Sequence, residues 1–262
     1  MKAKRLLLLA WGAALVAAVC WPFALPGEFL WRDMALLDHP ALSPSAFGGG
    51  SLPARNAPQD GFLAVVGGAW AARVLIFAAA ASSALTAARW ARSTASAVSA
   101  MGVAVANPFV IECLLQGQWS LVVAAWLAPV IAWGCLQGRP RLAWLALWAA
   151  SLTPTGGLFG GLIAVVCERE GRRRWLFAGG SVLLWLPWLV PSLVAGHPAA
   201  HGDPAAQAAA FAPRAEAYVG AVGSLLGFGG IWNAAAVPAS REHGFALAGV
   251  LVAALAILGA AR

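Results

Sequence analysis

The feature that most restricts the fold of this chain is a series of apolar stretches, each long enough to cross a lipid bilayer as a helix. A helix rises about 1.5 Å per residue, so about 20 apolar residues span a hydrocarbon core of about 30 Å. Such stretches occur at about 6–25, 70–88, 95–114, 119–136, 174–195 and 244–261. The sequence therefore predicts an all-α, polytopic transmembrane helical bundle.

The composition agrees with this class and argues against others. Hydrophobic residues make up 61% of the chain and charged residues 10%, and the mean hydropathy is +0.77, which lies outside the range of soluble proteins. The net charge of +7 would suit nucleic acid, but in a membrane chain it usually reflects basic cytoplasmic loops. We expect no nucleic-acid partner. The four cysteines form no CxxC pair, so neither a disulfide framework nor a zinc site is predicted.

The N-terminal segment begins with basic residues and continues into an apolar run, as a signal peptide also does. Its small-residue cleavage pattern is poor, and Val19 precedes Cys20 where a lipoprotein signal has a small residue. An uncleaved first transmembrane helix over about 6–25 is the better interpretation. Pro22 and Pro26 are expected to end it.

One apolar stretch does not fit a simple crossing. Residues 142–167 lie between the basic sequences "RPR" and "EREGRRR", and "TPTGG" at 153–157 interrupts them. Basic flanks favour the cytoplasm for both ends, while two full crossings would need about 40 residues. The sequence therefore predicts a broken or re-entrant pair of short helices that meet at a buried turn over 153–157. Irregular backbone at membrane depth is tolerated where protein buries it or where it lines a wet cavity.

The distribution of cations predicts the orientation of the chain. With the N-terminus in the cytoplasm, twelve of the 17 Lys and Arg residues lie on that side: Lys2, Lys4, Arg5, Arg89, Arg92, Arg139, Arg141, Arg169, Arg172, Arg173, Arg174 and Arg262. Only Glu168 and Glu170 join them, whereas all other acids and all four histidines fall on the opposite side. This partition follows the positive-inside rule. We expect a multi-pass protein of the plasma (inner) membrane.

Two long segments, about 26–69 and 196–243, carry nearly all the acids and histidines of the predicted outer side. Long polar loops in a membrane chain usually carry function, so we expect an outward-facing site at the membrane boundary. The sequence "HPAAHGD" holds His197, His201 and Asp203, but Pro198 and Gly202 disfavour the helix that would bring these ligands together. No metal site is predicted.

Three sequence features resemble a known enzyme family. An Asp follows the first transmembrane helix within a long first outer loop, and "NPFVIECLLQGQW" (107–119) and "GFGGIWNAAAVPASR" (227–241) are similar to stretches of large actinobacterial proteins. The family is that of the GT-C fold polyprenol-phosphate-sugar-dependent glycosyltransferases, among them arabinofuranosyltransferase-like membrane proteins. The resemblance implies a GT-C-like bundle in which residues 1–262 form a single transmembrane domain. Because members of the family are longer, we expect this chain to be incomplete at its C-terminus.

The resemblance also implies roles for particular residues. The catalytic acid of the family falls on Asp33, with Asp38 as its rival. Related sequences carry Arg after the residue that corresponds to Glu112, and Cys113 stands there in this chain. Partners implied by the family are a polyprenol-phosphate sugar donor, membrane lipids and a cell-envelope glycan or lipid acceptor, and no cofactor is expected.

The chemistry of the donor explains why one carboxylate is sufficient. A lipid phosphate leaves as a stable anion, so the reaction needs a base for the acceptor hydroxyl and cations for the phosphate, but no general acid. Asp33 would be the base, and arginines offer paired donors to phosphate oxygens. Candidates for donor-phosphate or substrate binding are Arg55, Arg73, Glu112, Gln118, Arg214 and Arg241. Candidates for stacking on a sugar are Trp31, Trp119 and Trp232.

Structural roles for the same residues stay open. Asp33 would equally pair with Arg32 or cap a short helix over 34–39, and Glu112 would mark the end of a transmembrane helix. Arg73 lies within an apolar stretch, where an arginine at the bilayer centre costs at least about 2.5–3.5 kcal/mol. We expect its side chain to face protein or the outer interface, opposite Asp60, Glu112 or a bound phosphate.

The function that the resemblance implies is an inverting membrane glycosyltransferase that acts at the outer face with Asp33 as base. Transport is the competing class, because a broken helix pair and an intramembrane arginine also occur in a flippase or a carrier of lipid-linked sugars. A non-catalytic membrane subunit is the third interpretation, which Cys113 and the short chain would favour.

The topology is testable by cysteine labelling in intact cells. In a variant without the native cysteines, Arg139→Cys and Arg172→Cys should be protected from an impermeant thiol reagent, because their basic flanks hold them in the cytoplasm. Ser51→Cys, in the first outer loop, should react. Labelling from outside at position 139 or 172 would contradict this orientation.

Overall fold

The computed structural model describes residues 2–47, 49, 57–194, 203–239, 241, 244 and 246–260, and this part of the chain is mainly helical. It divides into two compact units. Unit 1 contains Met1–Val105 and Trp119–Pro198, and unit 2 contains Ala106–Gln118 and Ala199–Arg262. Each unit is therefore assembled from two separate segments of the chain, and those of unit 2 are far apart in the sequence.

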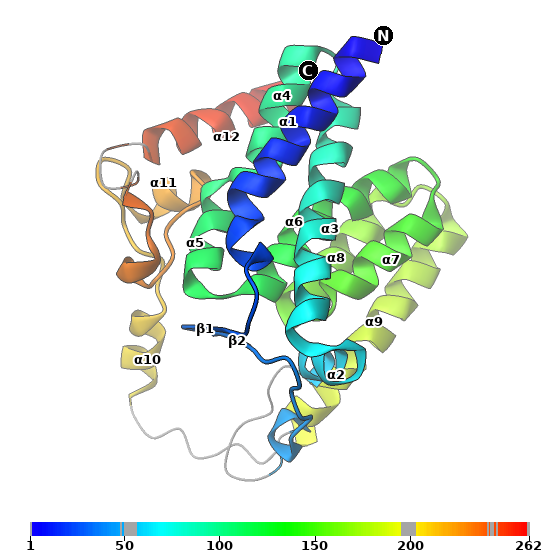
Figure 1. Ribbon diagram of the computed structural model, residues 1–262, viewed down its shortest axis with the longest axis vertical. Helices are drawn as coiled ribbons and strands as arrows, with labels where there is room; N and C mark the ends of the chain where they lie inside the picture. Colours follow the sequence, from blue (N-terminus) through cyan, green and yellow to red (C-terminus); the bar gives the residue numbers. More distant parts are fainter. Residues whose placement is uncertain are drawn as a thin grey trace. The chain divides into compact units, whose positions relative to one another are not determined.

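Unit 1 holds most of the helices and a short β-hairpin (Figure 1). Its helices are α1 (Lys2–Cys20), α2 (Ala57–Val66), α3 (Gly68–Trp90), α4 (Thr94–Ala106), α6 (Trp119–Leu136), α7 (Pro140–Ala150), α8 (Pro154–Cys167) and α9 (Gly171–Val194). The hairpin consists of strands β1 (Phe29–Trp31) and β2 (Met34–Leu36). Unit 2 contains α5 (Pro108–Gln116), α10 (Pro204–Ala210), α11 (Gly220–Leu226) and α12 (Ala246–Ala260).

Five helical stretches of the described chain are long and apolar enough to cross a membrane: Lys2–Ala24, Gly68–Trp90, Thr94–Gln116, Trp119–Leu136 and Gly171–Val194. They coincide with five of the six predicted spans. The sixth, predicted over 244–261, corresponds to α12, an apolar helix of 15 residues, which at about 1.5 Å per residue is shorter than a bilayer core. By length and composition, the chain is a multi-pass, membrane-embedded helical protein.

The first helix ends where the sequence predicted. Helix α1 stops at Cys20 and is followed by the 3₁₀ turn Trp21–Ala24, which contains Pro22. Proline has no backbone N–H to donate and its ring clashes with the preceding helical turn. The chain then enters the hairpin, so the short helix considered for 34–39 is instead the strand β2 with a following bend.

The predicted helix over 95–114 is interrupted at Asn107 and Pro108. Helix α4 ends at Ala106, and the Asn107 side chain accepts a hydrogen bond of 3.1 Å from the Val110 N–H. Pro108 occupies the first turn of α5, where its missing N–H costs no hydrogen bond. Asparagine followed by proline thus starts a new helix, α5, which belongs to unit 2.

The predicted pair of short helices between the two basic sequences is present. Helices α7 and α8 contain 11 and 14 residues and contact each other, and each is too short for a full crossing. The turn is buried but consists of residues 151–153, not 153–157. Pro154 begins α8 because proline is favoured in the first turn of a helix.

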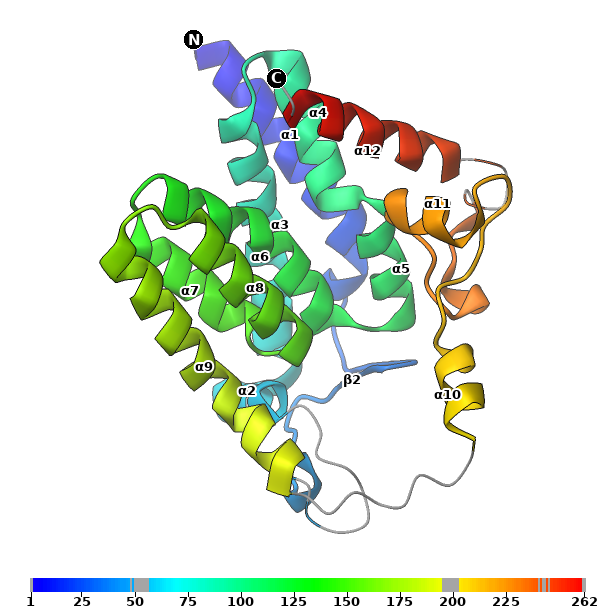
Figure 2. The ribbon, with the colours of Figure 1, turned by 180° about the vertical axis from the view of Figure 1, so that it is seen from behind.

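Helix α6 lies at the centre of unit 1, and α3, α7 and α8 pack around it (Figures 1 and 2). Close packing depends on small residues, as it does between membrane helices in general. The sequence "GGLFGG" contributes four buried glycines to α8. A Cβ on Gly156 would collide with the Ala150 carbonyl and with the Ala124 side chain. The glycines therefore serve helix packing, as predicted, and not phosphate binding.

Several basic residues of unit 1 lie near the start of α1 and the end of α3. Lys2, Lys4 and Arg5 of α1 lie around the same cavity as Arg89 near the end of α3. Arg89 and Arg139 both lie over the ring of Trp133, at 5.1 and 4.7 Å from its centroid. The sequence predicted that these cations share one side of the membrane, and the structure places them at one end of the unit.

Two glycine substitutions distinguish the effect of helix packing on stability from the effect of helix propensity. Gly156→Ala should lower the stability of the protein, because the new Cβ meets the backbone of Ala150, which cannot move aside. Gly179→Ala is the matched control, since Gly179 lies in α9 with nothing within 4 Å of the added Cβ. That change should raise the free energy of unfolding of the protein by up to about 1 kcal/mol, because alanine has a higher helix propensity than glycine. Thermal unfolding of both purified variants in detergent tests this, and equal midpoints would refute the packing role.

Candidate functional site

Asp33 lies at the tip of the hairpin that follows α1. Strands β1 and β2 pair in antiparallel fashion with Trp31 opposite Met34, which leaves Arg32 and Asp33 as the two-residue turn. Arg32 has a φ of 51°, and tight hairpin turns require such a positive φ. Met34 and Leu36 of β2 are buried, whereas Trp31 and Asp33 are exposed. The buried side chains of β2 thus anchor the hairpin, and Asp33 at its tip is exposed.

Arg73 holds the chain that leads from α1 into the hairpin. Its Nε donates to the Phe23 carbonyl at 3.1 Å, and its Nη2 donates to the carbonyls of Leu25, at 3.0 Å, and Gly27. The guanidinium also lies 4.8 Å from the ring centroid of Phe29. The expectation that Arg73 faces protein therefore holds, but backbone carbonyls are its partners. They are available because a chain that leaves a helix exposes carbonyls without helical partners.

The other side of the hairpin is tied to the start of α3. The Ala69 N–H donates to the Leu37 carbonyl at 2.8 Å, and the Asp38 N–H donates to Glu28 Oε1 at 3.2 Å. Gly68 has a φ of 56°, and a Cβ there would collide with the carbonyls of Leu37 and Asp38. Only glycine permits so close an approach. Asp38, the rival catalytic acid, thus follows the hairpin and is held near its root.

Unit 2 contains a buried ion pair between Glu216 and Arg241. Arg241 Nε donates to Glu216 Oε1 at 3.0 Å, and its Nη2 donates to Glu216 Oε2, which makes the contact bidentate. Arg214 Nη2 approaches the same carboxylate at 3.3 Å. The side chains of Arg241 and Glu216 are 3% and 0% exposed. Two arginines predicted to bind phosphate therefore neutralise an acid of the protein.

Glu112 lies on the buried face of α5, also in unit 2, and is 2% exposed. Its Oε2 accepts a hydrogen bond of 3.0 Å from the Ile231 N–H. Its Oε1 is buried with no hydrogen-bond partner among the described residues. One turn further along α5, Gln116 Oε1 accepts a bond of 2.7 Å from Asn233 Nδ2. The two side chains together fasten the segment 231–233 to α5.

The three tryptophans considered for sugar stacking differ in accessibility. Trp31 is 54% exposed beside Asp33, and Trp232 of unit 2 is 38% exposed and packs edge-on against Phe211. Trp119 is 2% exposed at the start of α6, so a sugar would reach its ring only if unit 1 opened. Trp31 is the one of the three that adjoins the proposed base.

The remaining predicted residues are placed as follows. Gln118 lies in the turn after α5, where its backbone N–H donates to the Cys113 carbonyl at 2.8 Å. Arg55, His197 and His201 lie outside the described residues. Within the described ranges, no three His, Cys, Asp or Glu side chains form a group that could hold a metal ion.

No protein-family model, curated protein or solved structure matches the chain.

Three residues of these clusters were not predicted from the sequence. They are Glu216, which pairs with Arg241, Asn233, which donates to Gln116, and Ser224. Ser224 Oγ accepts a hydrogen bond of 2.9 Å from the Glu216 N–H. The available signal was the acid between two arginines in an otherwise apolar region, "PRAEAY" and "ASREH". That pattern shows that charges need partners, but it does not show which charges meet.

The role of Glu112 can be tested by two substitutions. Glu112→Gln keeps an oxygen that accepts from the Ile231 N–H and removes a buried charge, so stability should be nearly unchanged. Glu112→Ala leaves that N–H unsatisfied and should cost about 1–3 kcal/mol. Thermal unfolding of the purified variants in detergent measures both. If Gln were as damaging as Ala, the carboxylate charge itself, and not the hydrogen bond, would be what unit 2 requires.

Proposed function

We propose that the protein is a membrane-embedded glycosyltransferase that moves a sugar from a polyprenol-phosphate donor to a glycan or lipid acceptor of the cell envelope. Transfer takes place at the membrane face opposite the basic end of unit 1 and inverts the anomeric configuration. Asp33 is the general base. The observation that carries the proposal is the placement of this carboxylate on an exposed hairpin tip directly after the first membrane-length helix.

The charge distribution of unit 1 supports this placement. The basic end includes Lys2 and Arg89, whereas the hairpin adjoins the opposite ends of α1 and α3. Positive charge favours the cytoplasmic face, so the hairpin is assigned to the outer face. A lipid-linked donor has its phosphate at the interface between the apolar core and water, and a rigid two-residue turn at that level would hold a carboxylate beside it.

The proposed reaction is a single displacement. Asp33 removes the proton from an acceptor hydroxyl as its oxygen forms a bond to the anomeric carbon of the sugar, and the bond between that carbon and the phosphate oxygen breaks. The polyprenol phosphate departs as an anion and needs no proton from the protein. One carboxylate therefore completes the proton transfers, in contrast to the paired carboxyls of glycosidases.

Three of the candidate arginines contact other groups of the protein. Arg73 binds carbonyls, and Arg214 and Arg241 bind Glu216. Arg32 adjoins Asp33 in the chain, and its guanidinium lies 5.1 Å from the ring centroid of Trp31. In the proposed site, Arg32 and Arg55 are the cations of the first outer segment that would meet the donor phosphate, and Trp31 would stack on a sugar.

A second candidate function, movement of the lipid-linked sugar across the bilayer, is favoured by one observation. The membrane-length stretch Thr94–Gln116 is discontinuous at Asn107 and Pro108, and discontinuous helices are common at the substrate sites of transporters.

The catalytic assignment is tested by Asp33→Asn, which keeps the size and polarity of the side chain and removes its proton affinity. Incubated with polyprenol-phosphate sugars radiolabelled in the sugar, membranes containing this variant should transfer label at least about 100-fold more slowly than the parent. Donor binding should be retained. Asp38→Asn is the matched control and should have much less effect, because Asp38 lies beyond the turn.

Transfer at the parental rate by Asp33→Asn would refute the assignment. If transfer is unchanged in both variants while movement of the labelled lipid across vesicle membranes falls in both, the protein is a transporter. If no radiolabelled donor is turned over or moved by the parent, the proposed function fails as a whole.

A further inference from the structure

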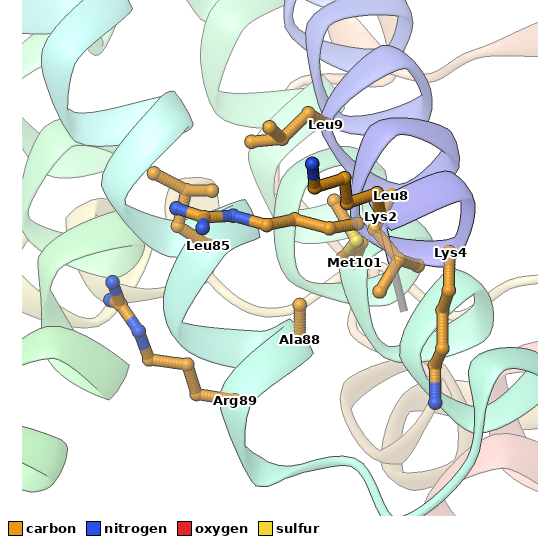
Figure 3. A pocket seen from close by; sticks show the side chains of 9 residues that line it. Lys2, Lys4, Leu8, Leu9, Leu85, Ala88, Arg89 and Met101 are labelled. Carbon is orange, nitrogen blue, oxygen red and sulfur yellow. The ribbon is translucent and has the colours of Figure 1, made fainter.

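An open cavity of about 830 Å³ lies at the basic end of unit 1, between α1, α3 and α4 (Figure 3). Four cations line it: Lys2, Lys4, Arg5 and Arg89. No acid lines the cavity, and none of the four forms a salt bridge within the described part of the chain. Figure 3 shows Lys4 and Arg89 on opposite sides of Ala88. The cavity is thus a site for a negatively charged group.

The floor of the same cavity is apolar. Leu8 and Leu85 lie there with Met101, which is fully buried. Side chains of this kind do not bind the oxygens of a free anion. They favour an occupant whose charged group is attached to a hydrocarbon part.

A second cavity borders the first, between α1 and α3. It measures about 450 Å³ and shares Leu9 and Leu85 with the basic cavity. The residues of α1 that line it are spaced three and four apart and so share one face of the helix: Leu9, Gly12, Ala13, Val16 and Ala17. Its lining on α3 is Phe77, Ala81, Ala84 and Leu85. The result is an apolar groove between two membrane-length helices that opens from a basic pocket.

The length of the groove matches one leaflet of a bilayer. From Leu9 to Ala17 the helix rises about 12 Å at about 1.5 Å per residue, and one leaflet contributes half of a hydrocarbon core of about 30 Å. The basic cavity lies at the end of the groove that is nearer the N-terminus of α1 and the C-terminus of α3. The termini of a membrane-spanning helix lie at the level of the lipid headgroups.

We propose that these two cavities together bind one anionic glycerophospholipid. Its charged headgroup lies in the basic cavity that Lys4, Arg5 and Arg89 line, and one acyl chain lies in the groove between α1 and α3. Arginine and lysine donate charge-assisted hydrogen bonds to phosphate oxygens, and basic pockets between transmembrane helices suit anionic lipid headgroups. The site lies at the opposite end of unit 1 from Asp33 and is independent of the proposed transfer reaction.

The purified full-length chain in detergent can be titrated with phosphatidylglycerol and observed by native mass spectrometry. Phosphatidylglycerol should bind more tightly than phosphatidylcholine with the same acyl chains, and added salt should weaken only the former. Inorganic phosphate in large excess should not displace the lipid, because the acyl chain contributes to binding. Equal affinity for the two lipids, or displacement by phosphate alone, would overturn the proposal.

Matched substitutions test the headgroup site. Lys4→Gln, Arg5→Gln and Arg89→Gln should each lower the affinity for phosphatidylglycerol about fivefold. Arg141→Gln removes a cation that does not line either cavity and should have little effect. If Arg141→Gln weakened binding as much as Arg89→Gln, net charge and not a defined site would attract the lipid.

Two neighbouring alanines of α1 test the groove. Ala13 lines it and Ala14 does not, and both are exposed, so leucine fits at either position without disturbing the core. Ala13→Leu should lower phosphatidylglycerol affinity about fourfold or more by displacing part of the acyl chain, whereas Ala14→Leu should not. Equal effects would refute the groove. Loss of a dimer signal in Ala13→Leu, with lipid binding unchanged, would identify a second copy of the chain as the occupant and overturn the proposal.

Discussion

The structure depends on one constraint, the need of every backbone N–H and C=O in apolar surroundings for a hydrogen-bond partner within the protein. Three helix ends show how the chain meets it. The carbonyls after α1 are bound by Arg73, and the start of α5 is capped by Asn107. At the end of α7, Ser151 directs both its N–H and its Oγ to the Leu147 carbonyl, at 2.9 and 2.8 Å. At these three places in the described chain, a specific side chain or cap satisfies backbone groups that a helix leaves without a partner.

The contacts of Arg73 have a consequence for the outer end of unit 1. By binding the carbonyls of residues 23–27 and the ring of Phe29, this side chain joins α3 to the root of the hairpin. The arginine that is most costly in an apolar helix is thus used to position the loop that carries Asp33. The guanidinium of Arg73 is thus engaged by backbone carbonyls at the root of the hairpin.

Buried charged side chains of unit 2 make contacts between distant parts of the chain. Glu216 and Arg241 are 25 residues apart, and Glu112 is 119 residues from Ile231. Removing one partner of a buried pair is strongly destabilising, whereas the intact pair adds little net stability. These contacts therefore select one arrangement of α5 with the segments that follow α10, more than they add to the free energy of folding.

The sequence by itself determined the membrane-spanning class and the positions of five apolar stretches of membrane length. It also determined the short helix pair between basic flanks and the role of "GGLFGG" in helix packing. Hydrophobic length, charge and glycine spacing are local properties of the sequence. It did not determine the hairpin at 29–36, the interruption at Asn107 or the shift of the buried turn to 151–153, where capping and packing overrode apolar continuity. Only the tertiary structure decided which groups the charged side chains contact. The sequence identified Arg73, Arg214 and Arg241 as cations, but their partners come from elsewhere in the chain. Apolar patterns report what is buried, whereas the pairing of polar groups depends on which segments the fold brings together.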